Sequence, residues 1–246
     1  MSVLVTRPHP DNAATAAALG AMGIAAVLAP ILRFEPVQSH GDADAAFDGV
    51  IVTSANALRA VENGGDTARL LELPLFAVGG HTAEAARAAG FRNVVDAGGD
   101  AAALAERVKA ALKKRKRAAV LLHLAGADLA SDLAGELGAQ GMTVVTQTVY
   151  RMVPVGRLPD DVCEAFAAQQ IEAVLHYSRR SARAFVDAAR HAGVEISALS
   201  LPQCCLSESI GAELREAGAV RVSVASAPNE AALLDTLLRA LGRGSG

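Results

Sequence analysis

The sequence is poor in residues and motifs for metal, disulfide or nucleotide chemistry. Its three cysteines are Cys163, Cys204 and Cys205, and the adjacent pair cannot readily close an unstrained disulfide. The chain has no CxxC motif, no His/Cys spacing typical of a metal site, no GxxxxGK[ST] loop, no GxGxxG after its first expected strand and no GxSxG turn. We therefore predict no metal and no disulfide framework, and a reducing cytoplasm as the location.

A large excess of positive charge is also missing. The formal net charge is −3, whereas a nucleic-acid-binding surface is normally strongly basic. The basic run at 113–117 follows an expected helix and precedes an expected buried strand, where cations complement the helix dipole. We predict no nucleic-acid partner, and any anion site has to be local.

The sequence lacks a convincing membrane span, although residues 13–32 carry no charge. Gly20, Gly23 and Pro30 interrupt this stretch, and the residues before it are rich in proline rather than basic. We interpret it as an alanine-rich helix, a glycine turn and a buried strand, and predict no membrane association.

What the chain does have is an internal repeat. Arg33 and Pro36 recur as Arg151 and Pro154 with one common offset, and each pair lies at the end of a strand-helix-strand pattern. At 246 residues and 52% apolar content, the chain has enough material for two hydrophobic cores. We therefore expect two similar halves joined at the two repeated stretches.

The sequence pattern in each half predicts alternating strands and helices. In the first half we expect strands at 3–6, 25–34, 50–53, 75–78 and 94–95, and helices at 11–20, 54–61, 82–89 and 100–112. In the second half, strands at 120–124, 173–177 and 204–206 and a helix at 128–137 correspond to them. This order predicts two five-stranded, flavodoxin-like α/β units with parallel sheets.

Small and hydroxyl-bearing residues follow the expected strands, at the sheet end where open parallel sheets bind ligands. Candidate binding residues are Arg7, Thr53, Ser54, Asn56, Gly79, Thr82, Gly126, Tyr177, Ser178 and Ser209. Together they offer many N–H and O–H donors to a carboxylate or phosphate. For each hydroxyl the alternative is helix capping. For Arg7 it is a partner carboxylate, and for Tyr150, in the second repeated stretch, it is simple packing.

Several segments together resemble the uroporphyrinogen-III synthase family over nearly the whole chain. They are residues 3–8 (VLVTRP), 50–57 (VIVTSANA), 77–79 (AVG) with Thr82, 149–151 (VYR), and Ser178 after a second strand. The resemblance implies one discontinuous domain, residues 1–35 with 156–246, and a second domain of residues 36–155. The linkers, near 31–37 and 149–155, would pair as a two-stranded β linker.

The resemblance also implies an activity. It is the cyclisation of hydroxymethylbilane to uroporphyrinogen III with inversion of the D ring through a spiro intermediate, in the biosynthesis of haem, sirohaem, chlorophyll and cobalamin. The enzyme, a lyase, would need no cofactor, act as a monomer, and receive its substrate from the synthase that makes it. The family has a functionally implicated tyrosine at the position of Tyr150, which would assist departure of the hydroxyl.

Two segments depart from the family pattern. Ala125 stands where the family often has an arginine, and residues 207–210 (SESI) replace a Gly-Pro-Thr-Thr segment, which adds the anion Glu208. These departures leave the individual carboxylate contacts open.

Two other functions remain open from the residues alone. Paired α/β domains also occur in non-enzymatic ligand-binding or sensor proteins, although we expect neither a signal peptide nor an output module from the patterns in this sequence. A flavodoxin-type FMN carrier would need a Ser/Thr-rich loop after the first strand, where this chain has the stiff segment Arg7-Pro8-His9-Pro10.

Overall fold

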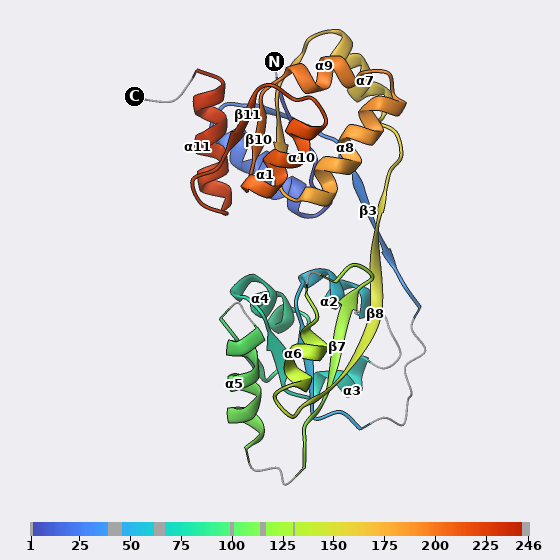
Figure 1. Ribbon diagram of the computed structural model, residues 1–246, viewed down its shortest axis with the longest axis vertical. Coiled ribbons are helices and arrows are strands. Elements are labelled where there is room, and N and C mark those ends of the chain that lie inside the picture. Colours follow the sequence, from blue (N-terminus) through green and yellow to red (C-terminus); the bar gives the residue numbers. More distant parts are fainter. Residues whose placement is uncertain are drawn as a thin grey trace. The chain divides into compact units, whose positions relative to one another are not determined.

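The computed structural model describes residues 2–38, 46–61, 67–98, 101–113, 117–129 and 131–242 (Figure 1). The chain forms two compact units. Unit 1 consists of residues 1–33 and 153–246, and unit 2 consists of residues 34–152. The chain therefore enters unit 2 once and returns from it once.

Unit 1 is built on a parallel sheet of five strands in the order β11-β10-β9-β1-β2. The strands are β1 (Ser2–Val5), β2 (Ala25–Leu28), β9 (Ile171–His176), β10 (Gln203–Cys205) and β11 (Val222–Val224). The helices are α1 (Asp11–Ala21), α7 (Asp160–Ala167), α8 (Arg179–His191), α9 (Glu195–Ser200), α10 (Glu208–Glu216) and α11 (Glu230–Ala240). In chain order the sheet reads 2-1-3-4-5, which is the flavodoxin-like order.

Unit 2 contains a sheet of six strands in the order β3-β8-β7-β4-β5-β6. The strands are β3 (Leu32–Pro36), β4 (Gly49–Val52), β5 (Leu75–Ala77), β6 (Val94–Asp96), β7 (Val120–Gly126) and β8 (Thr143–Pro154). The helices are α2 (Ala55–Val61), α3 (Thr67–Leu71), α4 (Gly80–Ala88), α5 (Ala101–Leu112) and α6 (Leu133–Gly138).

Five strands of unit 2 are parallel, and β3 is added to them. The Val37 amide donates to the Val149 carbonyl (2.8 Å) and the Val155 amide to the Ile31 carbonyl (3.0 Å), which is an antiparallel register. The prediction of five strands is therefore wrong for this unit, because the first repeated stretch pairs with the second and extends the sheet. The prediction of α/β architecture with parallel sheets is confirmed.

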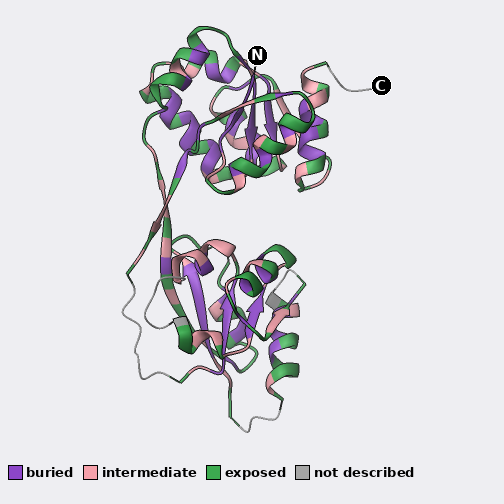
Figure 2. Ribbon diagram, turned by 180° about the vertical axis from the view of Figure 1, so that it is seen from behind, coloured by how far each residue is buried: buried purple, intermediate pink, exposed green. Residues whose placement is uncertain are grey.

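Helices cover both faces of each sheet, which explains why central strands such as β1 and β4 are almost continuously apolar and fully buried. In unit 1, Leu19 of α1 and Leu233 of α11 pack in one cluster with β1 and β9. In unit 2, α2 and α4 pack on one face of the sheet and α5 and α6 on the other. Figure 2 shows buried positions concentrated on the strands and on the inward sides of the helices.

Three expected boundaries were wrong. The strand expected at 25–34 is two strands, because Pro30 has no N–H to donate. The helix expected at 128–137 begins only at Leu133, where the Asp132 carboxylate accepts from the Gly135 amide (2.9 Å). Helix α4 begins at Gly80 rather than at Thr82 and ends, as predicted, before Gly90, whose φ of +98° favours glycine.

None of the helices in the described part of the chain is long and apolar enough to span a membrane.

Candidate functional site

The residues predicted from the sequence lie at the carboxyl ends of the two sheets and fall into one group in each unit. Unit 1 carries Arg7, Tyr177, Ser178 and Ser209, and unit 2 carries Thr53, Ser54, Asn56, Gly79, Thr82, Gly126 and Tyr150. Each group has its own geometry.

In unit 1, Arg7 lies in a network that already neutralises its charge. Its Nη2 is 3.0 Å from Asp11 Oδ2, and its Nη1 is 3.4 Å from Glu230 Oε1. The guanidinium carbon also lies 4.2 Å from the centre of the Tyr177 ring, a cation–π distance. Arg7 thus meets partner carboxylates, so a substrate anion would have to compete with Asp11 and Glu230.

Tyr177 belongs to the same network. Its hydroxyl donates to Glu230 Oε1 (3.1 Å) and lies 3.2 Å from Thr15 Oγ1. Burial raises the pKa of Tyr177 to about 12; Glu230 adds to this rise, while Thr15 and Arg7 oppose it. The phenol proton is therefore held by a carboxylate, and the role of Tyr177 as a substrate-binding donor stays a prediction.

The two serines of unit 1 differ in what they contact. Ser178 is the N-cap of α8, and its Oγ accepts from the Ser181 amide (3.1 Å). Ser209 is exposed, and its Oγ lies 3.1 Å from Ser207 Oγ. The added anion Glu208 contacts Arg215 at 2.6 Å, so its charge has a partner within its own helix.

In unit 2, Tyr150 lies directly against Gly126. The register between β7 and β8 shifts at Ala125/Gly126, so that Gly126 is paired with Tyr150. A Cβ atom on Gly126 would lie 2.7 Å from Tyr150 Cζ and 2.9 Å from its hydroxyl oxygen. Only glycine leaves room for the ring in this position.

Two residues that the sequence analysis missed complete the surroundings of Tyr150. The Phe34 ring of β3 stacks on it, with centroids 5.6 Å apart and planes inclined by 23°. The guanidinium of Arg59 in α2 lies 4.8 Å from the centre of Phe34, and Arg59 Nη1 donates to Asn56 Oδ1 (3.1 Å). Arg59 is recognisable in the sequence only as a cation three residues after Asn56.

The Tyr150 hydroxyl differs from that of Tyr177 because it makes no hydrogen bond within the described residues. Tyr150 is half-buried, its ring packs against the apolar cluster of unit 2, and its hydroxyl end lies close to Gly126. Around it, Ser54 Oγ accepts from the Asn56 amide (3.3 Å), and Thr53 is exposed. Gly79 is the N-cap of α4, and Thr82 is buried in its first turn.

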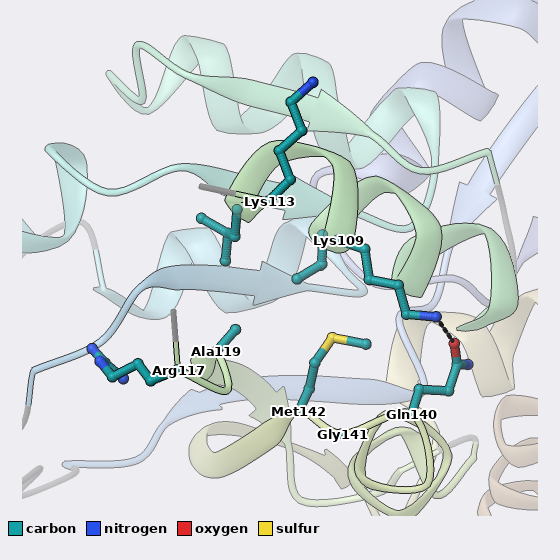
Figure 3. A pocket seen from close by; sticks show the side chains of 9 residues that line it. Lys109, Lys113, Arg117, Ala119, Gln140, Gly141 and Met142 are labelled. Atoms are coloured by element: carbon teal, nitrogen blue, oxygen red, sulfur yellow. Dashed lines mark hydrogen bonds between the residues drawn. The ribbon is translucent and has the colours of Figure 1, made fainter. Parts of the chain in front are cut away.

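A pocket of about 290 Å³ in unit 2 lies away from this group (Figure 3). It is bounded by the end of α5 and by the segments that lead into β7 and β8, at the amino ends of those strands. Its lining residues are Val108, Lys109, Leu112, Lys113, Arg117, Ala119, Gln140, Gly141 and Met142. Lys109 contacts Glu106 (2.8 Å) and Arg117 contacts Asp48 (2.8 Å), so both cations are already paired. Residues 114–116 of the basic run lie outside the described residues.

Comparison with known proteins gives one consistent result. A family model described as uroporphyrinogen-III synthase HemD matches residues 13–235. Uroporphyrinogen-III synthetase from Helicobacter pylori 26695 is structurally similar, with a TM-score of 0.66 and 18% identity over 97% of this chain and 98% of that one. A mutant uroporphyrinogen III synthase from the extremely thermophilic bacterium Thermus thermophilus has a TM-score of 0.55 and 18% identity over 99% and 100% of the two chains. No curated protein sequence matches.

Proposed function

The chain belongs to the uroporphyrinogen-III synthase family, lyases that cyclise hydroxymethylbilane in tetrapyrrole biosynthesis, and we propose that its own reaction inverts the D ring through a spiro intermediate. The observation that carries this proposal is the family match over residues 13–235.

In this reaction the hydroxyl of the hydroxymethyl group leaves as water after accepting a proton, and the methylene carbon remains as part of an azafulvene cation. The substituted carbon of the terminal pyrrole attacks that cation and gives a spiro intermediate. Fragmentation and reclosure then place the D ring in its inverted orientation. No external oxidant or reductant is involved, because the only net loss is water.

We propose that Tyr150 supplies the proton to the leaving hydroxyl. One observation supports this role. Its hydroxyl makes no hydrogen bond within the described residues, so its proton is not held by a protein acceptor. A phenol O–H that is not held by a protein acceptor can donate its proton to a leaving oxygen within hydrogen-bond distance.

We propose further that the substrate carboxylates are bound by the two groups of polar residues. In unit 2, Asn56 is half-buried in the first turn of α2 beside Ser54, and the first turn of α4 follows Gly79. Amides in the first turn of a helix have no partner within the helix and favour anions. In unit 1, Arg7 and Tyr177 would bind a carboxylate only after they exchange Glu230 for substrate, whereas Ser178 and Ser209 contact Ser181 and Ser207.

Three further statements belong to the same proposal. The two units act as two domains, with boundaries near residues 35 and 155. The protein acts as a monomer in the cytoplasm, on hydroxymethylbilane passed from its synthase. Neither a cofactor nor a metal takes part.

The test is the identity of the product. Hydroxymethylbilane generated in place by its own synthase cyclises spontaneously to the type I isomer, and we expect this protein to shift the product to type III. Addition of EDTA should not change the ratio. An isomer ratio equal to that of the enzyme-free control, or loss of the type III product with EDTA, would contradict the proposal.

A further inference from the structure

We propose that Phe34, Arg59 and Gly126 are positioning residues that hold the Tyr150 ring in one orientation; the catalytic part of this inference rests on the proposed function of Tyr150. The four residues come from β3, α2, β7 and β8, and all lie within unit 2. They form a column of contacts that begins at Asn56 and ends at the backbone of Gly126.

The first contact of the column fixes the Arg59 guanidinium. Asn56 and Arg59 are three residues apart on α2, so their side chains lie on one side of the helix. The Asn56 Oδ1 accepts from Arg59 Nη1 (3.1 Å) and directs the planar guanidinium toward Phe34, at 4.8 Å from its ring centre. A cation at this distance from an aromatic ring is attracted by the ring quadrupole.

The second contact passes from Phe34 to Tyr150. In the antiparallel register of β3 and β8 these two residues are diagonal neighbours on one face of the sheet. The centroid distance of 5.6 Å and the angle of 23° describe an offset stack, which is a favoured arrangement of two aromatic rings. Phe34 therefore restricts how far the Tyr150 ring can swing.

The third contact is the close approach to Gly126. The pairing register shifts at Ala125/Gly126, and such an irregularity re-aims a side chain relative to a regular ladder. It allows Val149 to enter the core, where it is 3% exposed, while the next residue, Tyr150, lies over the glycine. The Ala127 amide donates to the Tyr150 carbonyl (2.9 Å) and fixes the backbone at this position.

Because Phe34 and Gly126 hold the Tyr150 ring in one rotamer, the hydroxyl would face the substrate in one fixed orientation. A proton donor has to reach its acceptor within hydrogen-bond distance, so a fixed orientation raises the fraction of productive encounters. Substitutions that loosen the column should therefore lower kcat more than they change KM.

The composition of the chain allows this to be measured directly. The chain has no tryptophan and two tyrosines, so in a Tyr177→Phe background the near-ultraviolet tyrosine band comes from Tyr150 alone. A tyrosine held in one asymmetric environment gives a strong circular dichroism band, and a freely rotating one gives little. The spectra are recorded in this background, and the kinetics are measured in the otherwise wild-type enzyme.

We expect Phe34→Leu, Gly126→Ala and Arg59→Gln each to remove most of the Tyr150 band and to lower kcat by about three- to tenfold, with KM within about twofold of wild type. Arg59→Lys should restore the signal only in part, because an ammonium lacks the planar face of a guanidinium. Matched controls are Gly138→Ala, where an added Cβ meets nothing within 4 Å, and Arg87→Gln on the exposed side of α4. Both should leave the band and kcat unchanged.

Three results are decisive. A wild-type band in Gly126→Ala and Phe34→Leu overturns the positioning role. A raised KM with an unchanged kcat and band in Arg59→Gln makes Arg59 a substrate-binding cation and overturns its place in the column. Loss of the band with wild-type kcat leaves the column standing and overturns the proposed role of Tyr150.

Discussion

Each unit carries one tyrosine at the carboxyl end of its sheet, and the two are held in different ways. Tyr177 of unit 1 lies under Arg7, and its hydroxyl donates to Glu230. Tyr150 of unit 2 is held through its ring by Phe34 and Gly126, and its hydroxyl has no hydrogen bond within the described residues. Polar contacts thus satisfy the first tyrosine, whereas apolar contacts fix the second and leave its proton available.

This difference shows how a repeated fold can assign two roles to equivalent sheet ends. In unit 1 the Arg7 cation pairs with two carboxylates and the Tyr177 phenol donates to one of them, so these polar groups satisfy one another within the fold. In unit 2 the end of the Tyr150 ring packs against Gly126, and its hydroxyl has no protein partner within the described residues. We therefore expect unit 2 to contribute the proton donor, and unit 1 to contribute binding only after its network opens.

The largest expected effect is on folding stability. It concerns two buried histidines, which, like the two tyrosines, lie one in each unit. His176 of unit 1 is fully buried, and its Nε2 lies 2.8 Å from Gln203 Oε1. The Gln203 amide nitrogen donates to the Ala198 and Leu201 carbonyls, so its oxygen faces the ring and His176 is the neutral tautomer with Nε2–H. His123 of unit 2 is 2% exposed, and neither ring nitrogen has a partner within the described residues.

Acid should therefore destabilise unit 1. Burial lowers the pKa of His176 to about 4, with the Gln203 hydrogen bond opposing the shift in part. The unfolded chain, with a histidine pKa near ~6.5, binds the proton first, so stability is complete above that pH and falls as pH drops toward 4. The loss amounts to about 3 kcal/mol. Denaturant unfolding between these pH values, followed through Tyr177 in a Tyr150→Phe background, measures it.

The control for this prediction is His176→Phe, which should flatten the pH dependence of the stability of unit 1. An unchanged slope would mean that other groups cause the pH dependence.

His123 of unit 2 allows a comparison with His176, because burial lowers the pKa of His123 as well. The His123 ring nitrogens have no partner within the described residues. The free energy of unfolding of unit 2 at neutral pH should therefore be unchanged or higher in His123→Leu. His176→Leu should destabilise unit 1 by about 1–3 kcal/mol, since Gln203 loses its partner.

The next effect is on turnover, and it compares the two tyrosines directly. We expect Tyr150→Phe to lower kcat by about tenfold or more, because it removes the proton donor and retains the stacked ring. The electron-rich pyrrole already drives ionisation, so the loss should remain modest. The melting temperature should stay within a few degrees.

Tyr177→Phe is the matched variant in unit 1. It removes a hydroxyl that Glu230 already holds, so we expect KM to change more than kcat. If Tyr150→Phe turns over at the wild-type rate, the stack is only linker packing. Protonation of the leaving group would then fall to water or to backbone donors.

Much of the fold followed from sequence patterns, because continuous apolar strands such as Val3–Val5 and Val50–Val52 are typical of parallel sheets covered on both faces. The internal repeat around Arg33 and Arg151 also indicated where the two halves join. The exact ends of elements did not follow, since Pro30 divides an apolar run and Asp132 begins a helix later than the pattern suggested.

The position of the candidate residues at the strand ends was predictable from the sequence, and their contacts were not. Positions after the strands gave Arg7, Tyr177 and Gly126, because topology alone brings strand ends together. Glu230 could not be found in this way, since it lies 223 residues from Arg7 and no local pattern joins them. Phe34 was hidden for a similar reason, because its stack on Tyr150 depends on the register of two strands that are far apart in the sequence.

The smallest expected effect separates capping from binding among the hydroxyls at corresponding sheet ends. Ser178 of unit 1 caps α8, so Ser178→Ala should lower the free energy of unfolding of that unit by about 1 kcal/mol. Thr53 of unit 2 is exposed and makes no side-chain hydrogen bond within the described residues, so Thr53→Ala should change stability by less than about 0.5 kcal/mol. If Thr53 binds substrate, Thr53→Ala should raise KM moderately, as expected when one hydrogen-bond donor among many is removed. Denaturant unfolding followed through Tyr177 for unit 1 and Tyr150 for unit 2, together with steady-state kinetics, distinguishes the two roles. Equal destabilisation by both variants would mean that Thr53 is a structural residue, and a loss of turnover above about a thousandfold in either folded variant would reveal a catalytic hydroxyl instead.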